Sequence, residues 1–197
     1  MSATVTSRLD EVGMALLHAA DRLLAEEGPT ALTVRRIAAG AGVSTMNVYS
    51  RFGGKDGVVE QLYLQGFELL AAEMRDAGDT DDPLFDLQQC GLAYRRFALQ
   101  HVTLYAVMFE RVVADYEPSA SALEFATGTL GLLAARLERA MDAGLLRRMD
   151  PLHAAAIVWS TCHGAVSLQL KHSADAPVNW QQVYTDATAA VVRGLSA

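Results

Sequence analysis

Apolar residues recur every three to four positions along most of the chain, the spacing of one face of an α-helix. The first such segment runs from about Ser7 to Glu27 and stops at Gly28-Pro29. Glycine accepts the left-handed conformation that ends many helices, and proline cannot continue one. The pattern therefore predicts an amphipathic helix over about 7–27. Its apolar positions are Leu9, Val12, Leu16, Ala19, Leu23 and Leu24.

Two short helical segments follow, each with an N-cap and a glycine stop. Thr33 is a plausible N-cap for a helix through about Ala39, which Gly40-Ala41-Gly42 interrupts. Ser44 is the next plausible N-cap, for a helix over about 45–51 that ends before Gly53-Gly54. We then expect a longer helix over about 55–74.

The rest of the chain repeats the helical pattern without a convincing strand. An acidic, turn-rich stretch over 76–83 predicts a loop. Gly144, Asp150-Pro151 and the stretch 173–177 supply the later breaks. The sequence therefore predicts an all-α protein of about nine helices. The last five are expected near 84–100, 102–114, 119–143, 151–171 and 179–194.

The two short helices have the features of a helix-turn-helix. Such helices cross steeply only if the crossing residue is small and the turn tolerates left-handed backbone. Ala38 and Gly42 meet these two requirements. Ile37, Val43 and Val48 would then pack inward as the small core of the unit. The outer face of the second helix would carry groups suited to base edges and phosphates, namely Thr45, Met46, Asn47, Tyr49 and Ser50.

The distribution of charge decides whether nucleic acid is a reasonable partner. The net charge of −7 argues against it, yet the stretch 33–56 holds four basic residues and only one acidic residue. Local potential steers binding more than total charge does. Lys55 begins the helix after the motif, where its ammonium and the backbone N–H groups could together meet a phosphate.

At these residues the chain resembles the TetR family of transcription regulators. The matching positions are Ala38, Ala41-Gly42-Val43-Ser44, Val48-Tyr49, Phe52 and Lys55. The resemblance implies that residues 45–47 face bases, that Tyr49 and Lys55 contact phosphates, and that Ser44 caps the recognition helix. The candidate DNA-binding residues are Thr33, Arg35, Ser44, Thr45, Met46, Asn47, Tyr49, Ser50 and Lys55.

The motif also departs from the family, and it admits other interpretations. Asn47 stands where many relatives carry a small residue, Ser50 where an aromatic residue or histidine is frequent, and Gly53-Gly54 replaces a more polar turn. Alternatively, the segment is a helical hairpin of an enzyme or scaffold, with its aromatic residues in the core. Met46 could be a core residue, and Arg35 and Arg36 could be solvated surface.

The C-terminal part carries candidates for ligand binding. The run from His101 to Phe109 is apolar with a few polar groups, and Trp159 and His163 share one helical face before Gly164. These stretches resemble the TetR subgroup marked by a Trp-x-x-x-His-Gly motif, which implies a ligand or packing role. Packing in the core or a dimer interface is the alternative. The candidate ligand-binding residues are Phe67, Tyr94, Tyr105, Met108, Phe109, Met141, Trp159 and His163.

The last two predicted helices suggest how the protein assembles. In the family the corresponding pair forms a four-helix bundle with a second copy, and a symmetric dimer doubles the footprint on a pseudo-palindromic operator. Alternatively, these helices cover the core of one protomer. We expect a DNA-binding domain over 1–54 and a ligand-binding and dimerisation domain over 55–197. The expected protein is a homodimeric repressor released from double-stranded DNA by a small, largely apolar effector. A regulator or activator that needs no ligand is the alternative.

Several other classes are disfavoured. No apolar run approaches the roughly 18 residues that cross a bilayer, and the first residues lack the layout of a secretory signal. Cys90 and Cys162 form neither a disulfide framework nor a metal-ligand pattern. We therefore expect a cytoplasmic protein without membrane association, metal or other cofactor, and not an enzyme. Redox sensing by a cysteine, and an all-α enzyme using His163, Cys162 or an acidic pair, are the alternatives.

Overall fold

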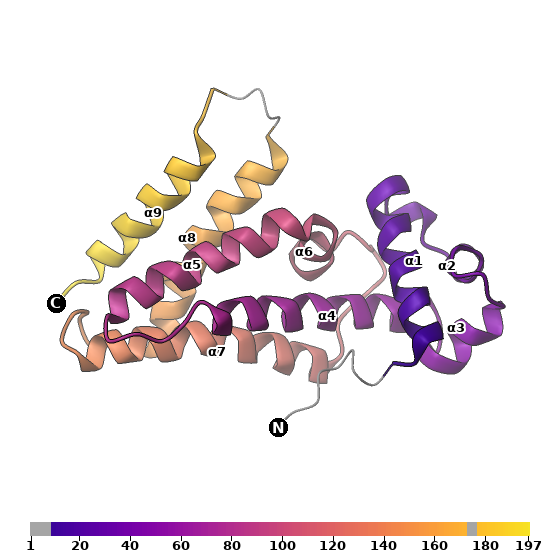
Figure 1. The fold of residues 1–197 in the computed structure, drawn as a ribbon, viewed down its shortest axis with the longest axis horizontal. Coiled ribbons are helices and arrows are strands. Elements are labelled where there is room, and N and C mark those ends of the chain that lie inside the picture. The colour runs from indigo at the N-terminus through magenta and orange to yellow at the C-terminus, as the bar shows by residue number, and fades with distance from the viewer. Residues whose placement is uncertain (1–8, 173–176) are drawn as a thin grey trace. The chain divides into compact units, whose positions relative to one another are not determined.

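The computed structural model describes residues 9–172 and 177–197, and over these residues the chain is all-α. This part contains nine α-helices and one short 3-10 helix (Figure 1). It contains no strand, and a single isolated bridge joins Leu146 to Ser196. The elements are α1 (Glu11–Glu27), η2 (Pro29–Ala31), α2 (Val34–Gly40), α3 (Thr45–Phe52), α4 (Lys55–Asp76), α5 (Pro83–Gln100), α6 (Val102–Phe109), α7 (Ala120–Asp142), α8 (Pro151–Lys171) and α9 (Trp180–Gly194).

The chain packs as two compact units. The first unit comprises the residues up to Glu68 together with His101–Ala126. The second comprises Leu69–Gln100 together with Thr127–Ala197. These units are defined by packing. The functional boundary between residues 54 and 55 is a different kind of division, and it stays a prediction.

Within the first unit, α1, α2 and α3 pack against one another (Figure 1), and α1 also contacts α6. Asp10 caps α1, since its carboxylate accepts a hydrogen bond from the Gly13 N–H at 2.8 Å. The core of the three-helix arrangement includes the fully buried side chains of Leu16, Ile37 and Val48. Burial of these apolar side chains supplies the main free energy that holds the short helices in place.

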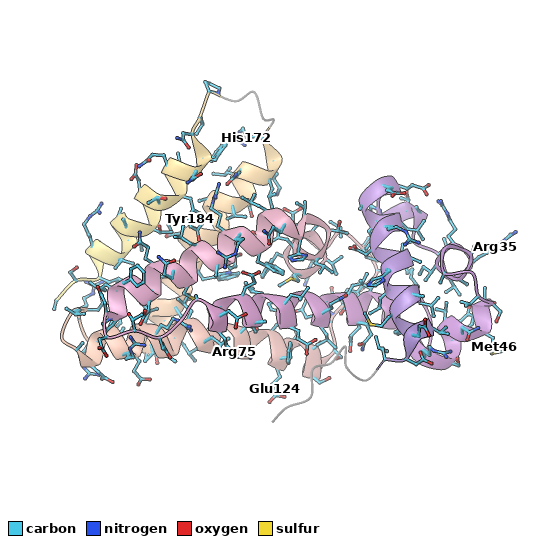
Figure 2. All side chains as sticks on the ribbon, in the orientation of Figure 1. Arg35, Met46, Arg75, Glu124, His172 and Tyr184 are labelled. Carbon is cyan, nitrogen blue, oxygen red and sulfur yellow. The ribbon has the colours of Figure 1, made fainter. Side chains whose placement is uncertain are left out.

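The second unit is organised by α8 and α9, which pack against each other and against α5 (Figure 1). Tyr184 of α9, labelled in Figure 2, is buried, and its hydroxyl donates a hydrogen bond to the carbonyl oxygen of Gly91 in α5. A buried hydroxyl needs such a partner, because leaving it unpaired costs free energy. The bond therefore fixes α9 on α5.

A buried carboxylate, that of Asp86, joins the start of α5 to α7 in the same unit. It accepts hydrogen bonds from the Thr80 N–H and hydroxyl, both at 2.8 Å, and it pairs with Arg139. Burial by itself would raise the pKa of Asp86, but the bonds from Thr80 and Arg139 hold that pKa below its ordinary value. The carboxylate is therefore charged in the folded protein.

The helices match the expected ones closely except at two places. We expected a helix over 102–114, and this was wrong, because α6 ends at Phe109. Arg111 then adopts a positive φ of 48°, and the loop is anchored by the buried Val113 and Tyr116. At the N-terminus α1 begins at Glu11 after its Asp10 cap, and the expected helical positions at 7 and 8 lie outside the described residues.

Replacing Arg139 by leucine should lower the thermal midpoint by several degrees, because it leaves the Asp86 carboxylate buried without its cation. The matched control is Arg148→Leu, which removes an exposed pair with Asp142 and should have little effect. Thermal unfolding followed by circular dichroism measures both.

The pKa of the Asp86 carboxyl is lower in the folded protein than its unfolded value of about 4. The stability that this carboxylate contributes is therefore fully present above the unfolded pKa, and it is lost as the pH falls through the folded pKa. The gap between wild type and Arg139→Leu should therefore narrow below about pH 4. Equal midpoints at neutral pH would contradict this assignment.

Candidate nucleic-acid interface and ligand cavity

The turn between α2 and α3 has the geometry that its glycine permits. Gly42 has a φ of +69°, which side chains with a Cβ rarely adopt. Its N–H donates to the Ala39 carbonyl at 3.1 Å, and the Val43 N–H donates to the Ala38 carbonyl at 3.0 Å. Ala38 is buried, as expected of the small residue in α2. Val43, expected to pack inward, is half-buried.

The outer face of α3 is exposed, whereas Val48 is fully buried beneath it. Met46 is 70% exposed and Tyr49 is 54% exposed. Figure 2 shows the side chains of Met46 and of Arg35 in α2 extending away from the ribbon. The alternative that Met46 is a core residue is therefore wrong, and Tyr49 is not a core aromatic. Thr45 and Ser50 are exposed on the same helix.

Ser44 does not cap α3 with its side chain, contrary to the expectation. It occupies the N-cap position, but its hydroxyl makes no capping hydrogen bond. Instead the Ser44 Oγ accepts a hydrogen bond from the side-chain amide of Asn47 at 3.2 Å. Thr33 does cap α2, because its hydroxyl oxygen accepts from the Arg36 N–H at 3.3 Å. The Ser44 O–H is thereby left to donate elsewhere, which suits a phosphate oxygen.

The side-chain oxygen of Asn47 also accepts a hydrogen bond, from Arg51, which is not among the candidate DNA-binding residues. Arg51, at the end of α3, donates to the Asn47 Oδ1 at 2.9 Å. The same guanidinium donates to both carboxylate oxygens of Asp10, at 2.9 and 2.6 Å. The hydrogen bond from Arg51, followed by that from the Gly13 N–H, lowers the pKa of Asp10 to about 2. The start of α1 is thus bound to the end of α3 by an ionised pair.

The basic residues near the motif differ in what they contact. Arg36 forms an ion pair with Glu27 of α1, and Arg22 donates to the Gly40 carbonyl at 3.1 Å. These two side chains stabilise the packing of α1 with α2. Arg35 is exposed, and Lys55 is half-buried at the first position of α4. Neither Arg35 nor Lys55 forms an ion pair with any of the residues that the structure describes.

Four of the predicted ligand-binding residues come together in the first unit. The ring of Phe109 lies 5.5 Å from that of Phe67 and 5.0 Å from that of Tyr105, measured between ring centres. Met108 and Phe109 line a cavity of about 120 Å³ beside this cluster. Met108 also packs directly against Gly66 of α4, where any larger side chain would collide with its sulfur. The other residues lining the cavity are Val59, Val107, Arg111, Val113, Tyr116 and Pro118.

The wall of this cavity is tied to α4 through Glu60. The Glu60 carboxylate accepts hydrogen bonds from the Ser119 hydroxyl at 2.7 Å and from the Ser119 N–H at 3.1 Å. The Tyr116 hydroxyl donates to it at 3.5 Å. Burial, with the nearby Glu60 charge, raises the pKa of Tyr116 well above its ordinary value. Tyr116 therefore stays a neutral donor at the cavity.

The remaining four candidates lie in the second unit. The Tyr94 hydroxyl is within 3.1 Å of the His163 Nδ1, and the His163 ring lies 5.2 Å from that of Trp159. Met141 is buried. A separate cavity of about 260 Å³ lies among α5, α8 and α9, and none of the predicted ligand-binding residues lines it. The eight candidates thus divide between two units instead of forming one set.

Other chemistry finds little support in the described residues. Cys90 and Cys162 are both buried. Burial raises the pKa of the Cys90 thiol to about 11 and also raises that of Cys162, so both thiols resist ionisation. Across residues 9–172 and 177–197 there is no cluster of metal-ligating side chains. No helix in these ranges combines the length and hydrophobicity that a membrane span requires.

Comparison with solved structures establishes the fold. A protein of unknown function from Rhodococcus sp. RHA1 aligns with a TM-score of 0.83 at 24% identity, over 96% of this chain and 98% of that chain. The TetR family regulator PfmR from Thermus thermophilus aligns with a TM-score of 0.72 at 22% identity, over 92% of this chain and 99% of that chain. At these identities the likeness concerns the fold alone.

Sequence comparison identifies the family. The transcriptional repressor KstR2 of Mycobacterium tuberculosis is 38% identical over 113 residues, which are 56% of this chain and 53% of KstR2. The match thus spans about half the length of that curated relative. Residues 16–62 match the family described as bacterial regulatory proteins, tetR family. Residues 87–191, more than half of the chain, match the tetracyclin repressor-like C-terminal domain. The chain therefore belongs to the TetR family of bacterial regulatory proteins.

Proposed function

We propose that this protein is a sequence-specific DNA-binding transcription regulator that acts as a repressor. The observation that carries the proposal is the form of α3, which is held from behind by the buried Val48 and is exposed on its outer face. A helix presented in this way enters the major groove of B-DNA. Similarity to the repressor KstR2 supports the sign of regulation. The activity requires DNA, which places it in the cytoplasm of a bacterial cell.

The proposed contacts fall into two classes. Thr45, Met46 and Asn47 face base edges, where Met46 offers an apolar surface to a thymine methyl group. Phosphate contacts fix the register without specifying sequence. The side chains proposed for these phosphate contacts are Thr33, Arg35, Ser44, Tyr49, Ser50 and Lys55.

The regulator acts as a homodimer through α8 and α9 in this proposal. Leu152 and Leu168 on α8 and Val183 on α9 are large apolar side chains left exposed in the protomer. Pairing with a second copy would bury exposed apolar side chains of this kind, and a symmetric dimer matches a pseudo-palindromic operator. Half-sites lie about one helical turn apart, so the dimer sets the spacing of the two α3 helices.

A small, largely apolar effector releases the regulator from its operator. The cavity of about 120 Å³ is lined mainly by apolar side chains and lies in the same unit as α1, α2 and α3. An engineered cavity of about 150 Å³ holds benzene, so a larger effector must displace side chains. That displacement would alter the packing of the unit that carries α3, which is the coupling that release requires. The Trp159–His163 pair, with its Trp-x-x-x-His-Gly pattern, is the second proposed effector region.

Lys55→Ala should weaken binding to all DNA sequences and reduce its salt dependence. Each phosphate contact contributes about 0.9 to the slope of log K against log salt concentration. A dimer loses one such contact in each protomer, so the magnitude of its slope should fall by about 1.8. Fluorescence anisotropy with labelled duplexes at several salt concentrations measures the slope. Arg75→Ala, which removes one positive charge from an exposed residue in the last turn of α4, is the control and should keep the wild-type slope. An unchanged slope in Lys55→Ala would remove Lys55 from the interface.

Leu168→Glu should dissociate the dimer, because it places like charges in an apolar interface. A rise of about 100-fold in the dimer dissociation constant is expected. Analytical ultracentrifugation gives this constant. Leu123→Glu on α7 is the matched control, since Leu123 is 51% exposed and Leu168 is 50% exposed. If both variants remain dimeric, α8 is not the interface.

Val113→Phe should fill the cavity and block the effector without weakening DNA binding. Suitable probes are decanoate, progesterone and toluene, which present an acyl chain, a steroid and a small arene. The probe that lowers wild-type operator affinity should be at least about tenfold less potent on the variant. Val112→Phe, one residue away and outside the cavity lining, should respond like wild type. Equal responses in wild type and Val113→Phe would place the effector elsewhere. No response to any probe would favour regulation without a ligand.

A further inference from the structure

We propose that Asp10, outside the recognition helix, is a positioning residue that sets the base preference of Asn47. It acts through Arg51, and the expected preference is for adenine. The inference rests on the proposed function, because it requires α3 to contact DNA bases. It adds to that function a residue that specifies sequence without touching DNA.

Asp10 holds the Arg51 side chain in one plane. The Nε and one terminal nitrogen of Arg51 donate to the two oxygens of Asp10, at 2.9 and 2.6 Å. This two-point contact between guanidinium and carboxylate fixes the plane of the Arg51 side chain. The other terminal nitrogen donates to the Asn47 Oδ1 at 2.9 Å. Asp10 and Arg51 are 41 positions apart in the chain, so only the packing of α1 against α3 brings them together.

Arg51 in turn determines the orientation of the Asn47 amide. A guanidinium has only donors, so the atom of Asn47 that faces Arg51 must be the oxygen. The amide nitrogen then faces Ser44 and donates to its Oγ at 3.2 Å. Rotating the amide by half a turn would point its N–H groups at Arg51 and lose that bond, whereas the Ser44 hydroxyl could still donate to the rotated oxygen, so the bond from Arg51 distinguishes the two orientations. The network therefore selects one of the two orientations that an asparagine can adopt.

The orientation of the Asn47 amide decides which base it can recognise. Asparagine recognises adenine by accepting from the N6 amino group and donating to N7. Within the network the Asn47 oxygen keeps a second lone pair and the nitrogen keeps a second hydrogen. These are the two groups that adenine requires, and their order along the helix is fixed. The reversed amide would present donor and acceptor in the wrong order, so fixing it creates discrimination.

Arg51 differs from the residues proposed to bind phosphates. Three of its nitrogens already donate within the protein, and its charge is balanced by Asp10. Arg51 therefore contributes little to the salt dependence of binding, unlike Lys55. A positioning role thus predicts a change in base preference with the salt slope retained.

The test compares base preference in wild type and Asp10→Ser. Serine is a good N-cap, so this variant keeps the cap of α1 while it removes the carboxylate that holds Arg51. A site is first selected for the wild type from a random duplex library. Each base pair is then changed in turn, and affinity is measured by fluorescence anisotropy at two salt concentrations. Asn47→Ala identifies the position that Asn47 recognises.

At that position wild type should prefer A·T by about tenfold, the scale of one good bidentate contact. Asp10→Ser should reduce the preference to about threefold or less, with a salt slope no smaller than that of wild type because no positive charge is removed. Arg51→Leu should reduce the preference in the same way, since it removes the other end of the contact. Glu27→Gln is the matched control, because it removes an acidic charge from α1 that pairs with Arg36 instead. It should keep the wild-type preference.

The outcomes separate this inference from the proposed function. If wild type binds its selected site and Asp10→Ser retains the full preference at the Asn47 position, the inference is overturned and the function stands. The same holds if Asn47→Ala leaves every preference unchanged. If wild type binds no duplex even at low salt, the proposed function fails, and the inference fails with it. Circular dichroism confirms that each variant is folded before binding is compared.

Discussion

A recognition helix of two turns cannot hold its own shape in water, and the first unit is built around that constraint. Isolated helices shorter than roughly 12–15 residues are marginal, because nucleation costs more than the few hydrogen bonds return. α3 has eight residues, and its buried Val48 is the part that the neighbouring helices stabilise. The ion pair between Asp10 and Arg51 also holds the C-terminal end of α3 to the start of α1. Support on one side leaves the other side available for a partner.

Most of the helix-turn-helix could be predicted because its signals are local. Gly42 in the turn and Gly53 at the end of α3 both take a left-handed conformation. Val48 is the buried apolar position within α3. Each of these features involves only a few consecutive residues. The end of α6 was missed for the opposite reason. Apolar periodicity continues through Val112 and Val113, whereas the loop there is held by the contact between Tyr116 and Glu60, 56 positions earlier in the chain.

The same distinction between local signals and contacts distant in the sequence applies to the candidate sites. Exposure of Met46 and Tyr49 follows from helical spacing, which turns both side chains away from the side of α3 that Val48 occupies, and the sequence predicted it. The contact of Asp10 with Arg51 did not follow, because the pattern placed Asp10 inside the predicted helix over 7–27 and its partner lies 41 positions later in the chain. The ligand-binding candidates have only their residue type in common, and aromatic and methionine side chains are common in every core. Residue type alone could not assign Phe109 to one unit and Trp159 to the other.

The contact between Gly66 and Met108 bears on how such a regulator could change its effector during evolution. Gly66 lets the Met108 side chain lie against the backbone of α4 while the same side chain forms part of the cavity wall. Methionine is unbranched and flexible, and it is readily exchanged for leucine or other apolar residues without moving the backbone. Single substitutions at position 108 can therefore change the volume of the cavity. For the proposed effector, new chemical specificity could therefore arise there without any substitution on the exposed face of α3.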